Sequence, residues 1–105
     1  MKREDGAKNN TGVMTPDLAF GRALRAVRDE RGVSQEQLAF DAGYDRSYIS
    51  LLENGHYSPS LIAVFRLAQA LDIRPSALLA RTEAAVNIIP ARPRADNGDT
   101  TDNQA

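Results

Sequence analysis

One short segment carries the side chains with the clearest capacity for specific chemistry. Arg46, Ser50 and Asn54 recur every four residues, so in a helix they line one side, with Ser47 and Leu51 beside them. Arginine can bond guanine O6 and N7 together, serine can bond base edges or phosphates, and an apolar side chain can contact the thymine methyl group. Because an α-helix fits the major groove of B-DNA, this pattern predicts a helix that reads double-stranded DNA.

Some of these residues also have a plainer interpretation. Exposed serines are common, so Ser47 and Ser50 could simply be solvated, and Leu51 could meet a neighbouring helix instead of a base. Tyr48 falls between the free and the buried faces, where it would either pack on the first helix or hydrogen-bond a phosphate; our interpretation is the phosphate. Arg46 is the strongest candidate for a base or phosphate contact.

Five helices are predicted between two polar ends, with no alternating strand pattern, so the fold is expected to be all-α. Hydroxyl, acidic or proline residues mark their starts, and glycines close the first three. The start signals are Thr15-Pro16-Asp17, Ser34 with Gln37 as a capping box, Asp45, Ser58-Pro59-Ser60 and Pro75, and the closing glycines are Gly32, Gly43 and Gly55. The fifth helix is expected to be short, through Leu78 and Leu79, with no defined end.

Apolar residues at helical spacing predict the core. They are Phe20, Leu24 and Val27, then Leu38, Ala39, Ala42 and Tyr44, then Ile49 and Leu52, and in the fourth helix Leu61, Val64, Leu67, Ala68 and Leu71. Gly43 supplies the positive φ that lets one helix stop and the next depart at a steep angle. We expect a flexible arm over 1–15, a helical domain over 16–82, and a C-terminal extension over 83–105 that is mostly disordered after residue 90.

The composition limits the possible functions. The 105 residues include no cysteine, which removes disulfides, thiolate zinc sites and cysteine nucleophiles and fits a cytoplasmic location. No paired carboxylates, glycine-rich phosphate loop or nucleophile with a matched base is present, and the lone His56 lacks neighbours for a metal site. We therefore expect neither an enzyme nor a cofactor or metal. No secretory signal or run of ~18 apolar residues occurs.

The charge balance is unusual for a nucleic-acid-binding protein. The net charge is −1, and residues 17–81 contain eight arginines and eight acidic residues. Simple electrostatic binders have a basic domain, with a pI above ~9. Binding to DNA would therefore depend on where the charges lie and not on their total.

A longer stretch resembles a known family. The segment GRALRAVRDERGVSQEQLAFDAGYDRSYISLLENGHYSPSLIAVFRLAQALDI is similar to the Cro/C1-type (Xre-family) helix-turn-helix domain. The resemblance covers about residues 20–79, and the elements SQEQLA, the glycine corner and YISLLENG with SPSL occur in order at the expected spacing. It implies a compact, lambda-repressor-like arrangement of five helices.

The resemblance also implies roles for individual residues. Gln35 matches a residue that holds a phosphate, and Asn54 with the amides near Gly55 matches a second phosphate clamp. Arg46, Ser47 and Leu51 match base-reading positions. Arg28 and Glu53 match a pair that bridges the first and third helices, although an ordinary surface pair worth under ~1 kcal/mol is the alternative. Many relatives bind as two-fold dimers, with two third helices about 34 Å apart.

Two functions remain open at this point. The leading prediction is a homodimeric transcriptional regulator, a repressor or controller, that binds an inverted repeat. The alternative is an antitoxin-like protein that binds a protein partner as well as DNA. Its binding strip would be the apolar segment 86–90, which holds Val86, Ile88, Ile89 and Pro90; the same segment could instead pack on its own domain or on a second copy.

Overall fold

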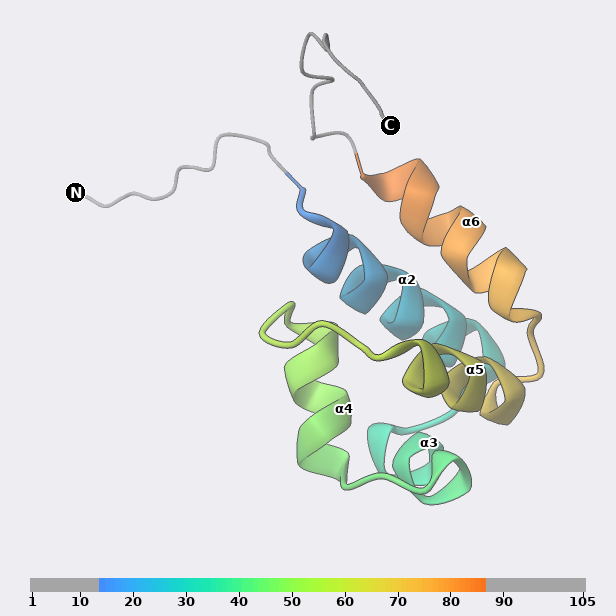
Figure 1. Cartoon of the computed structure of the whole chain (residues 1–105). Helices are drawn as coiled ribbons and strands as arrows, with labels where there is room; N and C mark the ends of the chain where they lie inside the picture. Colours follow the sequence, from blue (N-terminus) through green and yellow to red (C-terminus); the bar gives the residue numbers. More distant parts are fainter. Residues whose placement is uncertain (1–13, 87–105) are drawn as a thin grey trace, which may run out of the picture.

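Residues 14–86, which the computed structural model describes, fold into five helices without a strand (Figure 1). The helices are α2 (Pro16–Arg31), α3 (Gln35–Ala42), α4 (Arg46–Glu53), α5 (Leu61–Ala70) and α6 (Pro75–Ala85). This confirms the all-α prediction. The predicted arm except residues 14 and 15, the tail after residue 90, and most of the apolar segment 86–90 lie outside the described residues.

Local sequence signals set the ends of α2 and α3. Thr15 Oγ1 accepts a hydrogen bond from the Leu18 amide at 3.2 Å, and Gly32 ends α2 with φ of 68°. Ser34 Oγ accepts from the Gln37 amide at 3.0 Å, and Gly43 ends α3 with φ of 80°. Both glycines adopt the left-handed conformation that other residues avoid, so these helix boundaries are as predicted.

Asp45 is the N-cap residue of α4 and Ser34 that of α3, as predicted, but two side chains do not form the capping hydrogen bonds expected of them. The Gln37 side chain does not reach back to complete a capping box; it donates to Asp41 Oδ1 at 2.9 Å, one turn along the exposed face. Asp45 precedes α4 with an extended backbone, but its carboxylate makes no capping hydrogen bond to the helix. The Asp45 carbonyl oxygen accepts from the Tyr48 and Ile49 amides instead.

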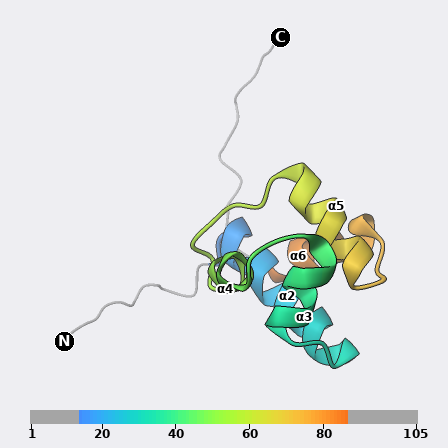
Figure 2. The same cartoon turned by 90° about the horizontal axis from the view of Figure 1, so that it is seen from below.

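The core lies where α2 packs against α4 and α6, and α3 against α4 and α5. Figure 2 shows α2, α3 and α6 gathered on one side of α4. The largest fully buried side chains are Leu24, Val27, Leu38, Ile49, Leu52, Leu67, Leu71 and Leu78. Burying each contributes roughly 1.5–3 kcal/mol relative to exposure. Leu61, expected on the buried stripe of α5, is instead 69% exposed. It is the first residue of the helix and lies at the edge of that stripe.

A glycine of α2 sets the distance between α2 and α4. A Cβ atom on Gly21 would collide with the Leu52 carbonyl oxygen and lie 2.6 Å from that of Glu53. The backbone of α2 therefore touches the end of α4 directly. Ser58, in the loop after α4, donates to Asp17 near the start of α2, so the end of α4 and the loop that follows it are both fixed to α2.

The last helix is longer than expected. α6 runs to Ala85, past the boundary predicted at residue 82, and lies beside α2 (Figure 1). Arg81 of α6 makes two hydrogen bonds to Glu30 of α2, at 2.7 and 2.9 Å. None of the five described helices is long and apolar enough to cross a membrane. Among residues 14–86, no cluster of His, Cys, Asp or Glu could hold a metal ion.

Candidate nucleic-acid interface

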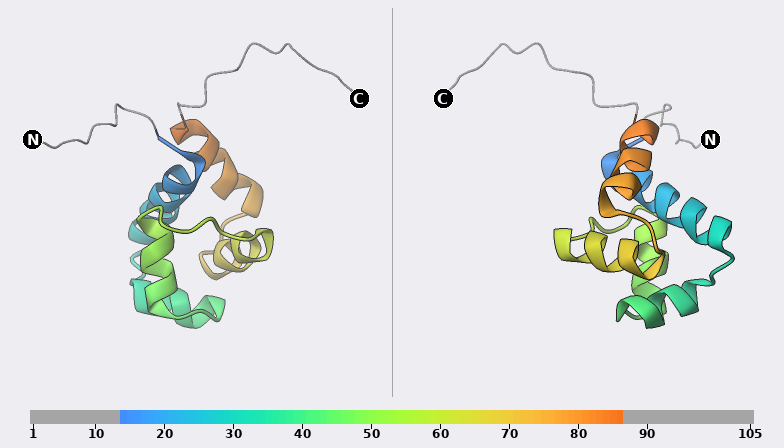
Figure 3. Two further views of the ribbon diagram at one scale, coloured as in Figure 1. Left: turned by 60° about the vertical axis from the view of Figure 1, so that its left-hand side comes forward. Right: turned by 90° about the vertical axis from the view of Figure 1, so that its right-hand side faces the viewer.

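The outer face of α4 has the exposure expected from its spacing. Arg46, Ser47 and Asn54 are exposed, and Ser50 and Leu51 are half-buried beside them. The opposite face, with Ile49 and Leu52, is fully buried in the core. Gly43 and the short turn after it let α4 leave α3 at a steep angle, and no other described helix lies in front of α4 (Figure 3, left).

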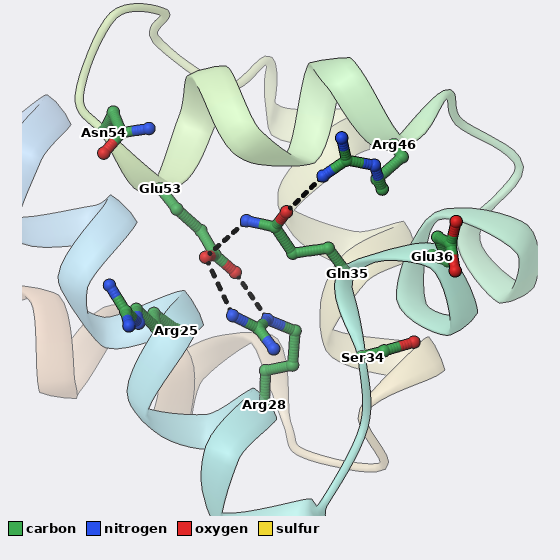
Figure 4. Close-up of a pocket in the computed structure, with 8 residues that line it drawn as sticks. All are labelled: Arg25, Arg28, Ser34, Gln35, Glu36, Arg46, Glu53 and Asn54. Atoms are coloured by element: carbon green, nitrogen blue, oxygen red, sulfur yellow. Dashed lines mark hydrogen bonds and ion pairs between the residues drawn. The ribbon is translucent and has the colours of Figure 1, made fainter.

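Behind this face, four polar side chains from three helices form a continuous hydrogen-bonded network (Figure 4). Arg28 of α2 donates from Nε to Glu53 Oε2 at 2.7 Å and from Nη2 to Glu53 Oε1 at 3.0 Å. Gln35 of α3 donates from Nε2 to the same Glu53 Oε1 at 3.0 Å. Arg46 of α4 donates from Nη1 to Gln35 Oε1 at 2.9 Å. We call these four residues the Glu53 network.

Burial makes the inner end of the network different from a surface ion pair. The Glu53 side chain is only 4% exposed and that of Arg28 only 12%. The interpretation as an ordinary surface pair is therefore wrong, and the predicted bridge between the two helices is present. The hydrogen bond with Glu53 raises the pKa of Arg28 above its ordinary value. Arg28 Nη1 also donates to the Val33 carbonyl oxygen at 3.0 Å, so the guanidinium is bound within the protein.

The side chain of Gln35 lies between Glu53 and Arg46, a position that the sequence did not predict. Both ends of its side-chain amide bond protein groups, Glu53 on one side and Arg46 on the other. The predicted phosphate contact would have to come from the backbone N–H groups of Gln35 and Glu36, which have no helical acceptor because they start α3. The side chain of Gln35 instead accepts a hydrogen bond from Arg46 Nη1.

An open hollow of about 590 Å³ lies over the network. It is lined by the four network residues and by Arg25, Ser34, Glu36 and Asn54 (Figure 4). Arg25 was not among the predicted site residues, although it lies three residues before Arg28 and hence on the same side of α2. Asn54 Nδ2 donates to the Ser50 carbonyl oxygen at 2.9 Å. Arginines thus stand at both ends of the hollow, Arg25 on α2 and Arg46 on α4.

Tyr48 belongs to a cluster of tyrosines on the flank of α4. Its ring centroid lies 4.8 Å from that of Tyr44 and 6.1 Å from that of Tyr57. Burial raises the pKa of Tyr48 above its ordinary value, and so, to a smaller extent, does Tyr44. Arg66 of α5 lies 5.7 Å from the Tyr44 ring centre, within range of a cation–π contact. Tyr48 therefore helps to pack α4 against its neighbours, and its phosphate contact stays a prediction.

Comparison with known proteins relates this geometry to characterised folds. A family model described as "Helix-turn-helix" matches residues 24–78. Control protein C.BamHI of Bacillus amyloliquefaciens is 38% identical over 63 residues, which make up 59% of this chain and 78% of that protein. The immunity repressor protein of Bacillus phage phi105 is 39% identical over 62 residues. Those residues are 59% of this chain and 43% of the repressor, so the similarity extends over less than half of that protein.

Among solved structures, the restriction-modification controller protein C.AhdI from Aeromonas hydrophila is similar with a TM-score of 0.57 and 48% sequence identity. The match covers 58% of this chain and 92% of C.AhdI. The likeness is therefore to nearly all of a small controller protein and to one part of a larger repressor.

Proposed function

Because the chain belongs to the Cro/C1-type helix-turn-helix family, we propose that it is a sequence-specific transcriptional regulator whose α4 reads the major groove of DNA in the cytoplasm. The observation that carries the proposal is the state of Arg46, which is exposed but held at Nη1 by Gln35. A side chain fixed in this way loses less conformational freedom on binding, so its contacts convert more fully into discrimination between bases.

The remaining donors around the hollow fit the phosphates on either side of the groove. The N–H groups at the start of α3 would bind one phosphate, and Arg25 with Asn54 would bind another. These contacts position α4, whereas Arg46, Ser47 and Leu51 face the bases. Glu36, the second residue of α3, also lines the hollow. Its negative charge opposes a phosphate at this helix start, whereas the free N–H groups there favour one.

We propose further that two copies bind together to an inverted repeat. A two-fold pair of such domains places its two reading helices in successive major grooves, about 34 Å apart, and requires a palindromic site. The similarity to a repressor and to controller proteins favours a regulator of this type.

Selection of bound duplexes from a random library, with full-length protein at moderate salt, tests the proposal. We expect an inverted repeat with half-sites one helical turn apart. Arg46→Ala should weaken binding to the selected site by about 1–3 kcal/mol and relax the preference at one position in each half-site. Arg74→Ala, which removes the same charge from the loop between α5 and α6, is the control and should leave the preference unchanged. No enrichment from folded protein would contradict the proposal.

The antitoxin-like alternative depends on the segment 86–90. Only Val86 of that segment lies within the described residues, where it follows α6 with an extended backbone. No contact of the described residues favours a protein partner there, so this function stays a prediction.

A further inference from the structure

Arg25 is the arginine of the hollow that the Glu53 network does not hold, and no dashed line joins it to that network in Figure 4. Its side chain is 66% exposed, and its Nε lies 3.8 Å from Asp29 Oδ2. This distance is longer than a hydrogen bond, so the two side chains are joined by the attraction of their charges. Arg25 can therefore exchange Asp29 for another anion without breaking a hydrogen bond.

Asp29 lies one turn after Arg25 on α2 and also approaches Arg28, whose Nη1 is 3.7 Å away. Arg28 does not depend on this contact, because it is hydrogen-bonded to Glu53 and to the Val33 carbonyl oxygen. The hydrogen bond with Glu53 has the largest effect in raising the pKa of Arg28, and the charge of Asp29 has the smallest. Asp29 therefore acts chiefly as the counter-ion of Arg25.

The stability of α2 gives little reason for an acidic residue at position 29. Asp29 lies in the last turn of the helix, where the partial negative charge of the helix end disfavours a carboxylate. An i,i+4 ion pair is also less favourable when the basic residue comes first, as Arg25 does here. Both side chains are mostly exposed, and exposed pairs contribute little to stability. The main consequence of Asp29 is thus its effect on the charge that Arg25 offers to a ligand.

We propose that Asp29 is an intramolecular competitor of the DNA phosphates, which neutralises Arg25 in the free protein and so limits the affinity for DNA of any sequence. The inference deepens the proposed function and rests on it for the contact between Arg25 and a phosphate. A phosphate must displace the Asp29 carboxylate or share the guanidinium with it. In either case the negative charge of Asp29 stays near the phosphate and opposes its binding.

The charges around the hollow show how far this competition reduces the attraction for DNA. The buried ion pair of the Glu53 network is neutral, which leaves Arg25 and Arg46 against Glu36 on the lining. With Asp29 beside Arg25, the two positive charges are balanced by two negative ones. Binding to arbitrary DNA depends almost entirely on phosphate neutralisation, so the protein is expected to leave arbitrary DNA readily.

The size of the effect follows from the release of counterions. For each phosphate that a protein neutralises, log K falls by ~0.9 for every tenfold rise in salt. One additional neutralised phosphate therefore strengthens binding by up to about eightfold at ~0.1 M salt relative to ~1 M. Phosphate contacts carry no direct sequence information, so removal of the Asp29 charge should strengthen binding to every duplex by a similar factor.

The test is Asp29→Asn in the full-length chain, because asparagine has nearly the same shape without the charge. Fluorescence anisotropy over a range of salt concentrations measures binding to the selected duplex and to a duplex of unrelated sequence and equal length. We expect binding to both to be roughly three- to eightfold tighter at moderate salt, with a slope of log K against log salt that is steeper by up to ~0.9. The base preference should not change. Circular dichroism shows whether the variant keeps the fold.

Two further variants separate competition for Arg25 from a general effect of charge. Glu83→Gln removes one negative charge from the exposed side of α6, away from the hollow, and should leave the affinity and the slope unchanged. Arg25→Ala should weaken binding to both duplexes. When Asp29→Asn is added to Arg25→Ala, we expect most of the gain to disappear, because the arginine that Asp29 neutralises is absent.

Three results would overturn the inference: an Asp29→Asn variant with the affinity and salt slope of the wild type, an equal gain from Glu83→Gln, or a full gain in the Arg25→Ala background. These results are distinct from failure of the proposed function. A gain from Asp29→Asn on arbitrary duplexes, with no base preference in any of the proteins, supports the role of Asp29 and contradicts the reading of bases. A base preference without that gain supports the proposed function and contradicts the role of Asp29.

Discussion

Glu53→Gln tests whether burial makes the Arg28–Glu53 pair contribute more to stability than a surface ion pair does. Glu53 Oε1 accepts from Arg28 and Gln35, and Oε2 accepts from Arg28. Glutamine has the shape of glutamate but only one side-chain oxygen. One of the two acceptor oxygens of Glu53 is therefore replaced by an NH₂ group, which faces an N–H donor of its neighbours. The positive charge of Arg28 would also lose its partner at a site where only 12% of the side chain is exposed.

The magnitude follows from the burial of the two partners. Breaking a fully buried ion pair costs about 3–5 kcal/mol, and a hydrogen bond to a charged group contributes about 1.5–3 kcal/mol. Arg28 would keep the Val33 carbonyl oxygen and the carboxylate of Asp29, which lies 3.7 Å from Nη1. We therefore expect Glu53→Gln to lower the free energy of unfolding by about 2 kcal/mol, a value in the lower part of the range for a hydrogen bond to a charged group. For a domain of this size, Tm should fall by roughly 10 °C.

Urea unfolding, monitored by circular dichroism, measures this loss of stability. We expect the urea concentration at the midpoint to fall while the slope of the unfolding free energy against urea concentration stays the same. The matched control is Glu30→Gln, because Arg81 and Glu30 have the same bidentate geometry but side chains that are 42% and 49% exposed. The hydrogen bonds from Arg81 hold the pKa of Glu30 below its ordinary value, so near neutral pH this pair is fully ionised and the comparison is fair. Exposed ion pairs contribute little to the free energy of unfolding, so we expect Glu30→Gln to leave the urea midpoint unchanged. Equal shifts in the two variants, or none for Glu53→Gln, would refute the argument from burial.

Two further predictions concern the fold. Gly21→Ala should destabilise the domain by about 1–3 kcal/mol, because the new Cβ meets the backbone of Leu52 and Glu53 and forces α2 and α4 apart. Urea unfolding measures this loss. A variant with the same urea midpoint as the wild type would show that the two helices separate easily. Removal of residues 91–105, all outside the described residues, should leave cooperative unfolding and DNA binding unchanged, and a broad or absent unfolding transition would show that this segment contributes to the fold.

The helix boundaries were predictable because they depend on local rules. A hydroxyl before the first turn and a glycine after the last one act within four residues of sequence, and Thr15, Ser34, Gly32 and Gly43 behave as those rules state. The free face of α4 was predictable for the same reason, since spacing alone separates Arg46 from the buried side of the helix.

Features that depend on how helices meet were beyond the reach of the sequence. Gln35 and Arg46 lie on different helices, and their hydrogen bond requires the angle between those helices, which no spacing rule gives. The need for glycine at position 21 arises only because the end of α4 crosses there. Leu61 fits an apolar stripe by spacing, yet spacing cannot show that the first turn of α5 projects beyond its neighbours.

The arginines of this neutral domain differ in how far they are available to DNA. Arg28 is paired with Glu53 inside the protein and Arg81 with Glu30 on the side of α6, so neither is free to neutralise phosphates. Arg25 and Arg46 remain beside the hollow. Few phosphate contacts mean a small gain from counterion release and hence weak binding to arbitrary DNA. Under the proposed function, affinity then comes from correct base contacts and from two half-sites bound together, so selectivity depends on the rigidity of the Glu53 network more than on total charge.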